Sequence, residues 1–206
     1  DLDEWTTDAM SGLSDRSVES GNAAYAGTAQ TGQPQGYRTV TPGQYEFFEY
    51  YYQETTNSTG GGIRLLNSNG DVECGFTTDN PEWDYESGNG VNQDWYNPGN
   101  DYYNVWHRVQ MWFDWTNSDF TLRVTRLDTG YQQEVTAPLE QGVDIARVQW
   151  DEYNGGTWQG GSGIDMWIDE MSLGSTRLEV TVNEDPDGDG TAENTASQVV
   201  SDGQNT

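Results

Sequence analysis

Residues 102–127 read YYNVWHRVQMWFDWTNSDFTLRVTRL, and this stretch decides the fold. Apolar side chains alternate with polar ones on both sides of a polar turn at residues 116–119. The apolar set consists of Val109, Met111, Phe113, Trp115, Leu122 and Val124. Because successive side chains on a strand point to opposite faces, the pattern predicts a β-hairpin with one buried face. An isolated hairpin is marginally stable in water, so this one needs a second layer.

The rest of the chain contains further strand patterns of the same kind. Apolar and aromatic runs bounded by turn residues occur at residues 44–53, 63–66, 71–77, 143–150 and 164–173. An Asn-Gly pair at residues 69–70 is a strong hairpin signal, and no segment shows helical periodicity. The sequence therefore predicts an all-β domain over residues 1–173, built of two packed antiparallel sheets. Residues 174–206 are acidic and poor in apolar side chains, and we expect an acidic tail or linker there.

The charge balance is strongly acidic. The chain has 35 Asp and Glu against 8 basic residues, all of them Arg, and its net charge is −27. Nine Trp and twelve Tyr are too many for a disordered acidic chain. We therefore expect a folded, acid-coated protein from a halophilic source, in which salt screens the self-repulsion. No basic stripe is available to neutralise phosphates, which argues against nucleic acid as a partner.

Several smaller features bear on where the protein works. The single cysteine, Cys74, rules out an internal disulfide, and its setting is typical of a packed core thiol. No apolar run approaches the roughly 20 residues of a transmembrane helix, so no membrane insertion is expected. Asn57 begins an Asn-Ser-Thr glycosylation sequon in a Ser/Thr/Gly-rich loop, which favours an exported protein. The expected location is therefore extracellular, on a cell surface or a virion surface.

Four short motifs along residues 1–173 point to a known architecture. They are LDEW at residues 2–5, AAYAGT at 23–28, WHRV at 106–109 and WIDEMSL at 167–173. Together they resemble the first, second, central and closing strands of the concanavalin A-like lectin/glucanase superfamily, in its laminin-G-like form. The resemblance implies a jelly-roll sandwich and a binding or adhesive role. The family's glucanases have Glu-x-Asp-x-x-Glu on one strand, and this chain has no such string.

The polar faces of the predicted strands form the main candidate site. If these strands share one sheet, its open face displays Arg, Gln and Asp side chains around two Trp rings. The candidate glycan-binding residues are Arg108, Gln110, Trp112, Arg123, Arg147, Gln149, Asp165 and Trp167. Proteins bind sugars in this way, with aromatic rings against C–H groups and polar side chains bonded to hydroxyls. An equally weighted alternative is that the arginines neutralise an acidic surface that binds no ligand.

Residues 79–104 form the longest irregular stretch, and they are rich in aromatic side chains. Trp83, Trp95 and Tyr96, with Trp158 from a later Gly-rich loop, are candidates for the rim of a sugar groove or for a protein contact. Packing over the sheet is the alternative for each of them. His107 is the only histidine, which excludes a multi-histidine zinc site, and we expect it to pack or hydrogen-bond locally.

The tail contains the pattern of a calcium loop. The carboxylates at its first, third, fifth and ninth positions are those of Asp185, Asp187, Asp189 and Glu193. Gly190 at the sixth position permits a sharp turn. The pattern resembles the calcium-binding repeats of thrombospondin type 3 and of haloarchaeal surface-protein linkers, which implies a structural calcium ion.

These observations favour an extracellular glycan-binding or adhesion module of a halophilic cell surface, or of a virus that infects such a cell. The alternative is a structural subunit or surface domain of a filament, spike or capsid that binds no glycan. Its partners would be neighbouring surface-protein subunits, including copies of this chain. A glycanase ranks third, and we do not expect an enzyme.

Overall fold

The computed structural model describes residues 6–7, 11–14, 23–26, 36–54, 60–78, 83–88, 90–97, 102–154, 157–158, 166–174, 177–184 and 194–201. Every regular element in these ranges is a β-strand. No helix in the described ranges is long and apolar enough to cross a membrane.

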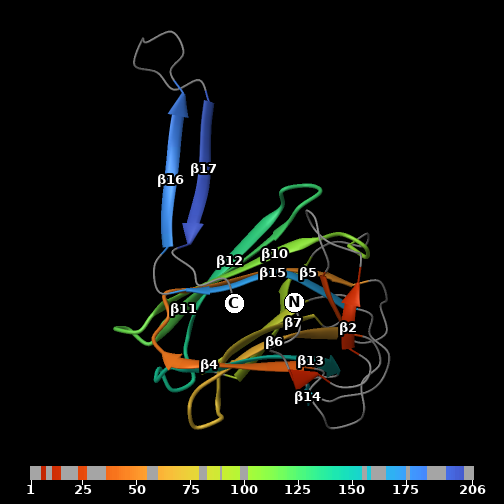
Figure 1. The fold of residues 1–206 in the computed structure, drawn as a ribbon, viewed down its shortest axis with the longest axis vertical. Coiled ribbons are helices and arrows are strands. Elements are labelled where there is room, and N and C mark those ends of the chain that lie inside the picture. The colour runs from red at the N-terminus through yellow and green to blue at the C-terminus, as the bar shows by residue number, and fades with distance from the viewer. Residues whose placement is uncertain are drawn as a thin grey trace.

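Most of the described strands belong to two antiparallel sheets, which we call sheet A and sheet B. Sheet A runs in the order β1 (Thr6–Thr7), β4 (Gly36–Gly43), β13 (Ile145–Asn154), β6 (Gly60–Leu66), β7 (Val72–Thr78), β8 (Trp83–Ser87) and β9 (Gly90–Tyr96). The short β14 (Thr157–Trp158) also pairs with β13. Sheet B runs in the order β12 (Gln132–Pro138), β11 (Asp119–Arg126), β10 (His107–Asp114), β5 (Phe47–Glu54), β15 (Met166–Gly174), β3 (Ala23–Ala26) and β2 (Ser11–Ser14). The two sheets form the layers of a sandwich (Figure 1), so the predicted all-β, two-sheet architecture is confirmed.

The hairpin predicted from residues 102–127 is β10 and β11. Val109 faces Val124 and Met111 faces Leu122 across the pair, and all four side chains are fully buried. This register places the apolar set on the inner face of sheet B and the polar set on its outer face.

The core between the sheets is largely aromatic. Phe48, Tyr50 and Tyr52 enter it from β5, and Trp83 and Trp150 enter it from sheet A. Cys74 is a buried free thiol in this core, as predicted. Buried aromatic rings contribute large apolar areas, which lets a strongly acidic chain stabilise a compact fold.

The C-terminal part contains a separate two-stranded sheet. Strand β16 (Arg177–Glu184) pairs with β17 (Asn194–Ser201) in an antiparallel hairpin (Figure 1). Residues 177–182 also have a weak strand pattern, but the second strand of this hairpin, within the expected acidic tail, was not predicted. The predicted calcium loop at residues 185–193 lies outside the described residues.

One carboxyl group is buried where the two sheets meet. Glu54 of β5 is 3% exposed, and its Oε2 accepts a hydrogen bond of 2.8 Å from the Tyr52 hydroxyl. The same oxygen lies 2.8 Å from Oγ1 of Thr78 on β7, so the contact links sheet B to sheet A. Burial raises the pKa of the Glu54 carboxyl from 4.5 to about 7, although the bonds from Thr78 and Tyr52 oppose the shift.

Glu54 should make the protein less stable as pH rises. The folded state keeps this proton up to about pH 7, whereas the unfolded chain loses it near 4.5. The free energy of unfolding should therefore fall by about 3 kcal/mol through this window. Urea denaturation between pH 4.5 and 8 should show the loss in the wild type and a flatter profile in Glu54→Gln. Parallel profiles for the two proteins would contradict the assignment.

Candidate functional site

The structure divides the predicted site residues between the two sheets. Strands β10, β11 and β15 belong to sheet B, but β13 lies in sheet A between β4 and β6. The expectation of one shared sheet is therefore wrong for Arg147 and Gln149. The alternation of side chains along β13 predicts which of them point outward. A strand in either sheet would show the same alternation, so the pattern does not predict which sheet contains β13. Asp165 lies outside the described residues.

The outer face of sheet B carries Arg108, Gln110, Trp112 and Arg123 from the predicted set. Arg108 and Gln110 both donate to Oε2 of Glu49, at 2.8 and 2.7 Å. Nε of Arg123 donates to Oε2 of Glu134 at 2.8 Å. The guanidinium carbon of Arg123 also lies 4.9 Å from the centre of the Trp112 ring. These polar groups therefore bond mainly to one another.

Two of the predicted stacking or bonding groups on sheet B are buried. Trp167 is 8% exposed and Gln110 is 4% exposed, and Gln149 of sheet A is buried to a similar degree, at 6%. Trp112 is half-buried, and Arg123 lies over its ring.

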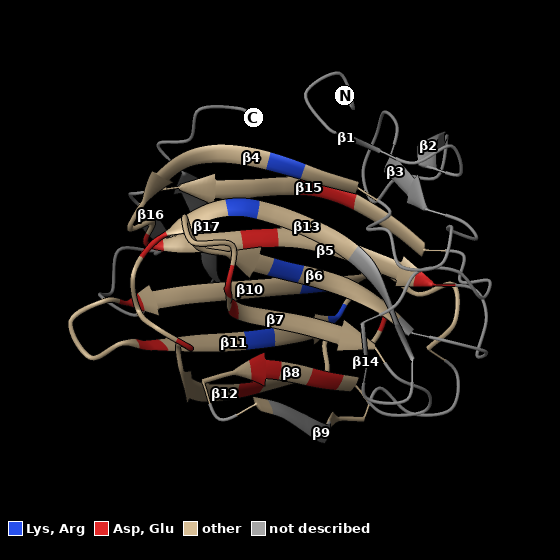
Figure 2. Ribbon diagram, turned by 90° about the horizontal axis from the view of Figure 1, so that it is seen from below, with Lys and Arg blue, Asp and Glu red and all other residues tan. Residues whose placement is uncertain are grey.

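The outer face of sheet A brings together a second polar set. Gln149 stands opposite Tyr37 of β4 and opposite Arg64 of β6. Arg64 in turn faces Gly75 of β7, which faces Glu86 of β8. Figure 2 shows the basic positions of β13 and β6 and the acidic positions of β8 on this sheet. This row crosses β4, β13, β6, β7 and β8. It contains a phenol, an amide, a guanidinium and a carboxylate, from Tyr37, Gln149, Arg64 and Glu86.

Gly75 interrupts this row with a position that has no side chain. A Cβ added there would lie 3.3 Å from Cγ of Arg64 and 3.6 Å from Cβ of Glu86. The side chains of Arg64 and Glu86 therefore pack over the backbone of β7 at Gly75, which is buried.

Arg147 adjoins this row and differs from the arginines of sheet B. Its guanidinium carbon lies 4.8 Å from the centre of the Tyr37 ring. It forms no ion pair with any residue in the described ranges. Arg108 and Arg123, in contrast, lie 2.8 and 2.7 Å from carboxylate oxygens.

No family model matches the chain, and no curated protein matches it. Among solved structures it is similar to arcelin-5, a lectin-like defense protein from Phaseolus vulgaris, with a TM-score of 0.52 and 11% identity over 84% of this chain and 94% of that one. It is also similar to the catalytic domain of a glycoside hydrolase family 131 protein from Coprinopsis cinerea, with a TM-score of 0.53 and 11% identity over 81% and 77% of the two chains. This chain has the concanavalin A-like jelly-roll fold. The fold implied by the four sequence motifs is thus confirmed.

The aromatic residues expected at the rim of the jelly roll lie mostly in its core. Trp83 and Tyr96 are fully buried, with ring centres 5.3 Å apart, so the rim prediction is wrong for both. They lie on β8 and β9, within a segment that the sequence suggested was irregular. Trp95 is half-buried, and its carbonyl accepts a hydrogen bond from Gln133. The side chain of Trp158 lies outside the described part.

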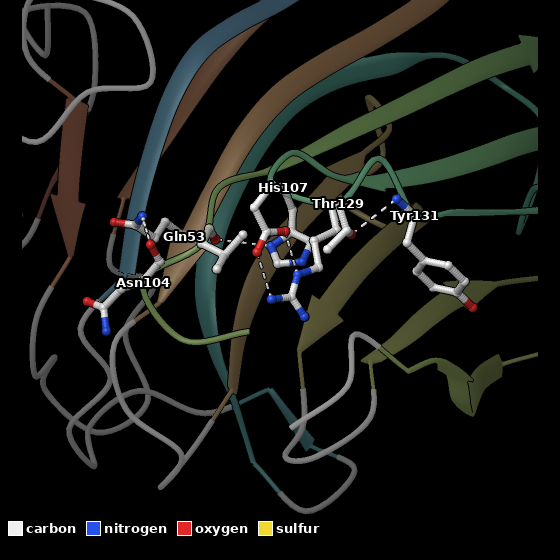
Figure 3. A network of polar contacts seen from close by, with 8 residues as sticks. Gln53, Asn104, His107, Thr129 and Tyr131 are labelled. Carbon is white, nitrogen blue, oxygen red and sulfur yellow. Dashed lines mark hydrogen bonds and ion pairs between the residues drawn. The ribbon is translucent and has the colours of Figure 1, made fainter. Parts of the chain in front are cut away.

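His107 has a structural position at the start of β10. Its ring is fully buried, 4.4 Å from the ring of Trp83, and Nδ1 lies 3.1 Å from the carbonyl oxygen of Val105. Burial lowers the pKa of His107 to about 3, although the bond to Val105 opposes the shift. Figure 3 shows His107 together with Gln53, which donates a 2.7 Å hydrogen bond to the Asn104 carbonyl. The predicted local packing of His107 is confirmed.

The described part of the jelly roll contains no cluster of three or more His, Cys, Asp or Glu residues suited to a metal ion. The predicted calcium ligands Asp185, Asp187, Asp189 and Glu193 lie outside that part, as does the sequon at Asn57. Calcium binding in the tail and glycosylation of Asn57 therefore stay predictions.

Proposed function

We propose that this jelly roll is a carbohydrate-binding module whose ligand lies on the outer face of sheet A. The observation that carries the proposal is the row of Tyr37, Gln149, Arg64, Gly75 and Glu86 across adjacent strands. Amide, guanidinium and carboxylate groups bond sugar hydroxyls, and an aromatic ring packs on sugar C–H groups. The lectin-like and glycoside hydrolase structures that share the fold support a saccharide as ligand.

Sheet A is favoured over sheet B as the ligand-binding face because the arginines of the two sheets have different partners. On sheet B, Glu49 accepts from both Arg108 and Gln110, and Glu134 accepts from Arg123. A ligand there would have to break charge-assisted hydrogen bonds within the protein before forming its own. On sheet A, Arg147 has Tyr37 as its partner among the described residues and no carboxylate to displace.

The wider setting of the proposal follows from the charge of the chain. A net charge of −27 fits a protein that works in high salt, where exposed charges are screened over a few ångströms. We propose an extracellular adhesion role on a halophilic cell surface or on a virus that infects such cells. A structural calcium ion in residues 185–193 belongs to the same proposal.

A glycan array probed with wild-type protein at high salt tests the function, and paired variants test the face. Tyr37→Ala and Gln149→Ala should each weaken binding about tenfold or more, because each removes a stacking or hydrogen-bonding group. Gln110→Ala and Trp112→Ala make the matching changes on sheet B and should leave the affinity within about twofold of the wild type. Melting temperatures of all four variants identify any that fail to fold.

Each other result has a definite meaning. Absence of binding to every glycan on the array would overturn the function. Loss of binding in Trp112→Ala but not in Tyr37→Ala would move the site to sheet B. Glu86 lies on the proposed face, so the bound saccharides should also be examined for cleavage by mass spectrometry. Shorter products that disappear in Glu86→Gln would make the protein a glycanase rather than a binding module.

A further inference from the structure

We propose that the saccharide bound by sheet A is acidic, and that Arg147 binds its carboxylate or sulfate group. This inference rests on the proposed function and adds the chemical class of the ligand. It starts from the distribution of charge. The chain has 35 acidic residues and 8 arginines, so an arginine on its surface has many carboxylates to pair with. Arg108, Arg123 and Arg126 each lie within 2.8 Å of one.

No acidic residue occupies the adjacent described positions around Arg147 on sheet A. Its partners on the adjacent strands are Thr39 of β4 and Leu66 of β6. The next outward positions on those strands hold Tyr37 and Arg64, and the next one along β13 holds Gln149. The adjacent positions on three strands are thus neutral or basic. Two arginines near each other favour an anion there, in contrast to the net charge of the whole chain.

The carboxylate nearest to Arg147 in sequence is that of Asp144, and it bonds elsewhere. Oδ1 of Asp144, three residues before Arg147, accepts a 2.8 Å hydrogen bond from the backbone N–H of Ser68. This bond holds Asp144 on the turn between β6 and β7. The Asp144 carboxylate forms no ion pair with Arg147.

The contact with Tyr37 prepares the guanidinium group for an anion. Its carbon lies 4.8 Å from the ring centre, and both side chains are half-buried. A guanidinium held over an aromatic ring is fixed in position and keeps N–H donors for a bidentate contact with a carboxylate or sulfate. Gln149, which is 6% exposed, lies beside it and adds an amide for a neighbouring hydroxyl. Arg147 would then discriminate between charged and neutral sugars, while Tyr37 and Gln149 would bind either.

The test compares saccharides that differ in charge alone. The probes are tetragalacturonate and its methyl ester, a carrageenan tetrasaccharide and its desulfated form, and 3′-sialyllactose and its methyl ester. Binding is measured by calorimetry in about 1 M KCl, where the Debye length is about 3 Å and the repulsive field of the acidic chain is screened. At least one acidic probe should bind about tenfold more tightly than its neutral partner.

Variants assign this preference to Arg147. Arg147→Gln should abolish the difference between the acidic and the neutral probe, and Arg147→Lys should retain part of it because lysine keeps the charge without the planar fork. Arg123→Gln is the matched control, because Arg123 also lies over an aromatic ring but pairs with Glu134. It should leave the difference unchanged. Melting temperatures confirm that the variants fold.

The outcomes separate this inference from the function on which it rests. Equal affinity for acidic and neutral probes, or a preference that survives in Arg147→Gln, would overturn the acidic ligand while leaving a carbohydrate-binding module. Failure of all six probes would also overturn it, and the glycan array would then decide the function by itself.

Discussion

The wild-type protein should lose about 4 kcal/mol of unfolding free energy to His107 between pH 7 and pH 3. The ring is fully buried beside Trp83 and Tyr96, and burial lowers the pKa of His107 from 6.5 to about 3. The unfolded chain therefore takes up a proton near pH 6.5, whereas the folded protein does not until about pH 3. Stability from this residue is complete above pH 6.5 and falls as the pH drops through that window.

The comparison must be made with a variant, because acid also protonates the many carboxylates of this chain. His107→Phe keeps a ring in the cavity and removes the titration. Urea denaturation of both proteins between pH 7 and pH 3 should show that the unfolding free energy of the variant rises relative to that of the wild type as pH falls. A constant difference between the two curves would mean that His107 takes up its proton at the same pH in the folded and the unfolded protein. Below pH 4.5, Glu54→Gln should show the same acid loss as the wild type, because the Glu54 contribution changes only above that pH.

The second large effect is expected at Glu73, which holds the connection between β12 and β13. Its side chain is fully buried on β7. Oε2 accepts from the backbone N–H groups of Gln141 and Gly142, at 3.0 and 2.8 Å. Oε1 accepts from Nδ2 of Asn67 at 3.0 Å and from the N–H of Val143 at 3.2 Å. One carboxylate therefore satisfies four donors.

Glu73→Gln should lower the free energy of unfolding by about 4 kcal/mol, because the new amide nitrogen would face donors and leave at least two of them unpaired. Glu140→Gln is the matched control in the same connection, because Glu140 is exposed and its side chain should contribute less than about 0.5 kcal/mol. Both values come from chemical denaturation at fixed pH and salt. Equal, small losses in the two variants would show that the connection is held by other contacts.

The sequence predicted correctly which side chains of β10 and β11 face the core, but it did not predict which sheet contains each strand. Alternation at Val109, Met111, Leu122 and Val124 was sufficient for the β10–β11 hairpin, because burial of one face imposes a period of two. The same rule operates in both layers, so it does not decide that Arg147 lies in sheet A. That choice depends on a connection whose anchor, Glu73, is one of 35 acidic residues and has no distinguishing local pattern.

The rim prediction failed although a signal was present. Residues 83–86 alternate as Trp-Asp-Tyr-Glu, which is a strand pattern, but the surrounding Asn, Gly and Pro residues suggested a loop. Trp83 is instead the centre of the aromatic core, in contact with Tyr52, Phe76 and Tyr102. The sequence also contained no sign that Tyr37 lies beside Arg147, because that contact joins strands about a hundred residues apart, a separation over which local patterns have no influence.

The position of β13 also determines when the protein can fold during synthesis. Strands β4 and β6 are made early, but each pairs with β13 rather than with the other. Until the ribosome has released residues 145–154, both therefore expose strand edges that can pair with other chains. In sheet B, the late strand β15 likewise lies between two early strands, β5 and β3. A nascent chain of this protein consequently needs protection from aggregation until most of it has been made, and truncations that end before β13 should be insoluble.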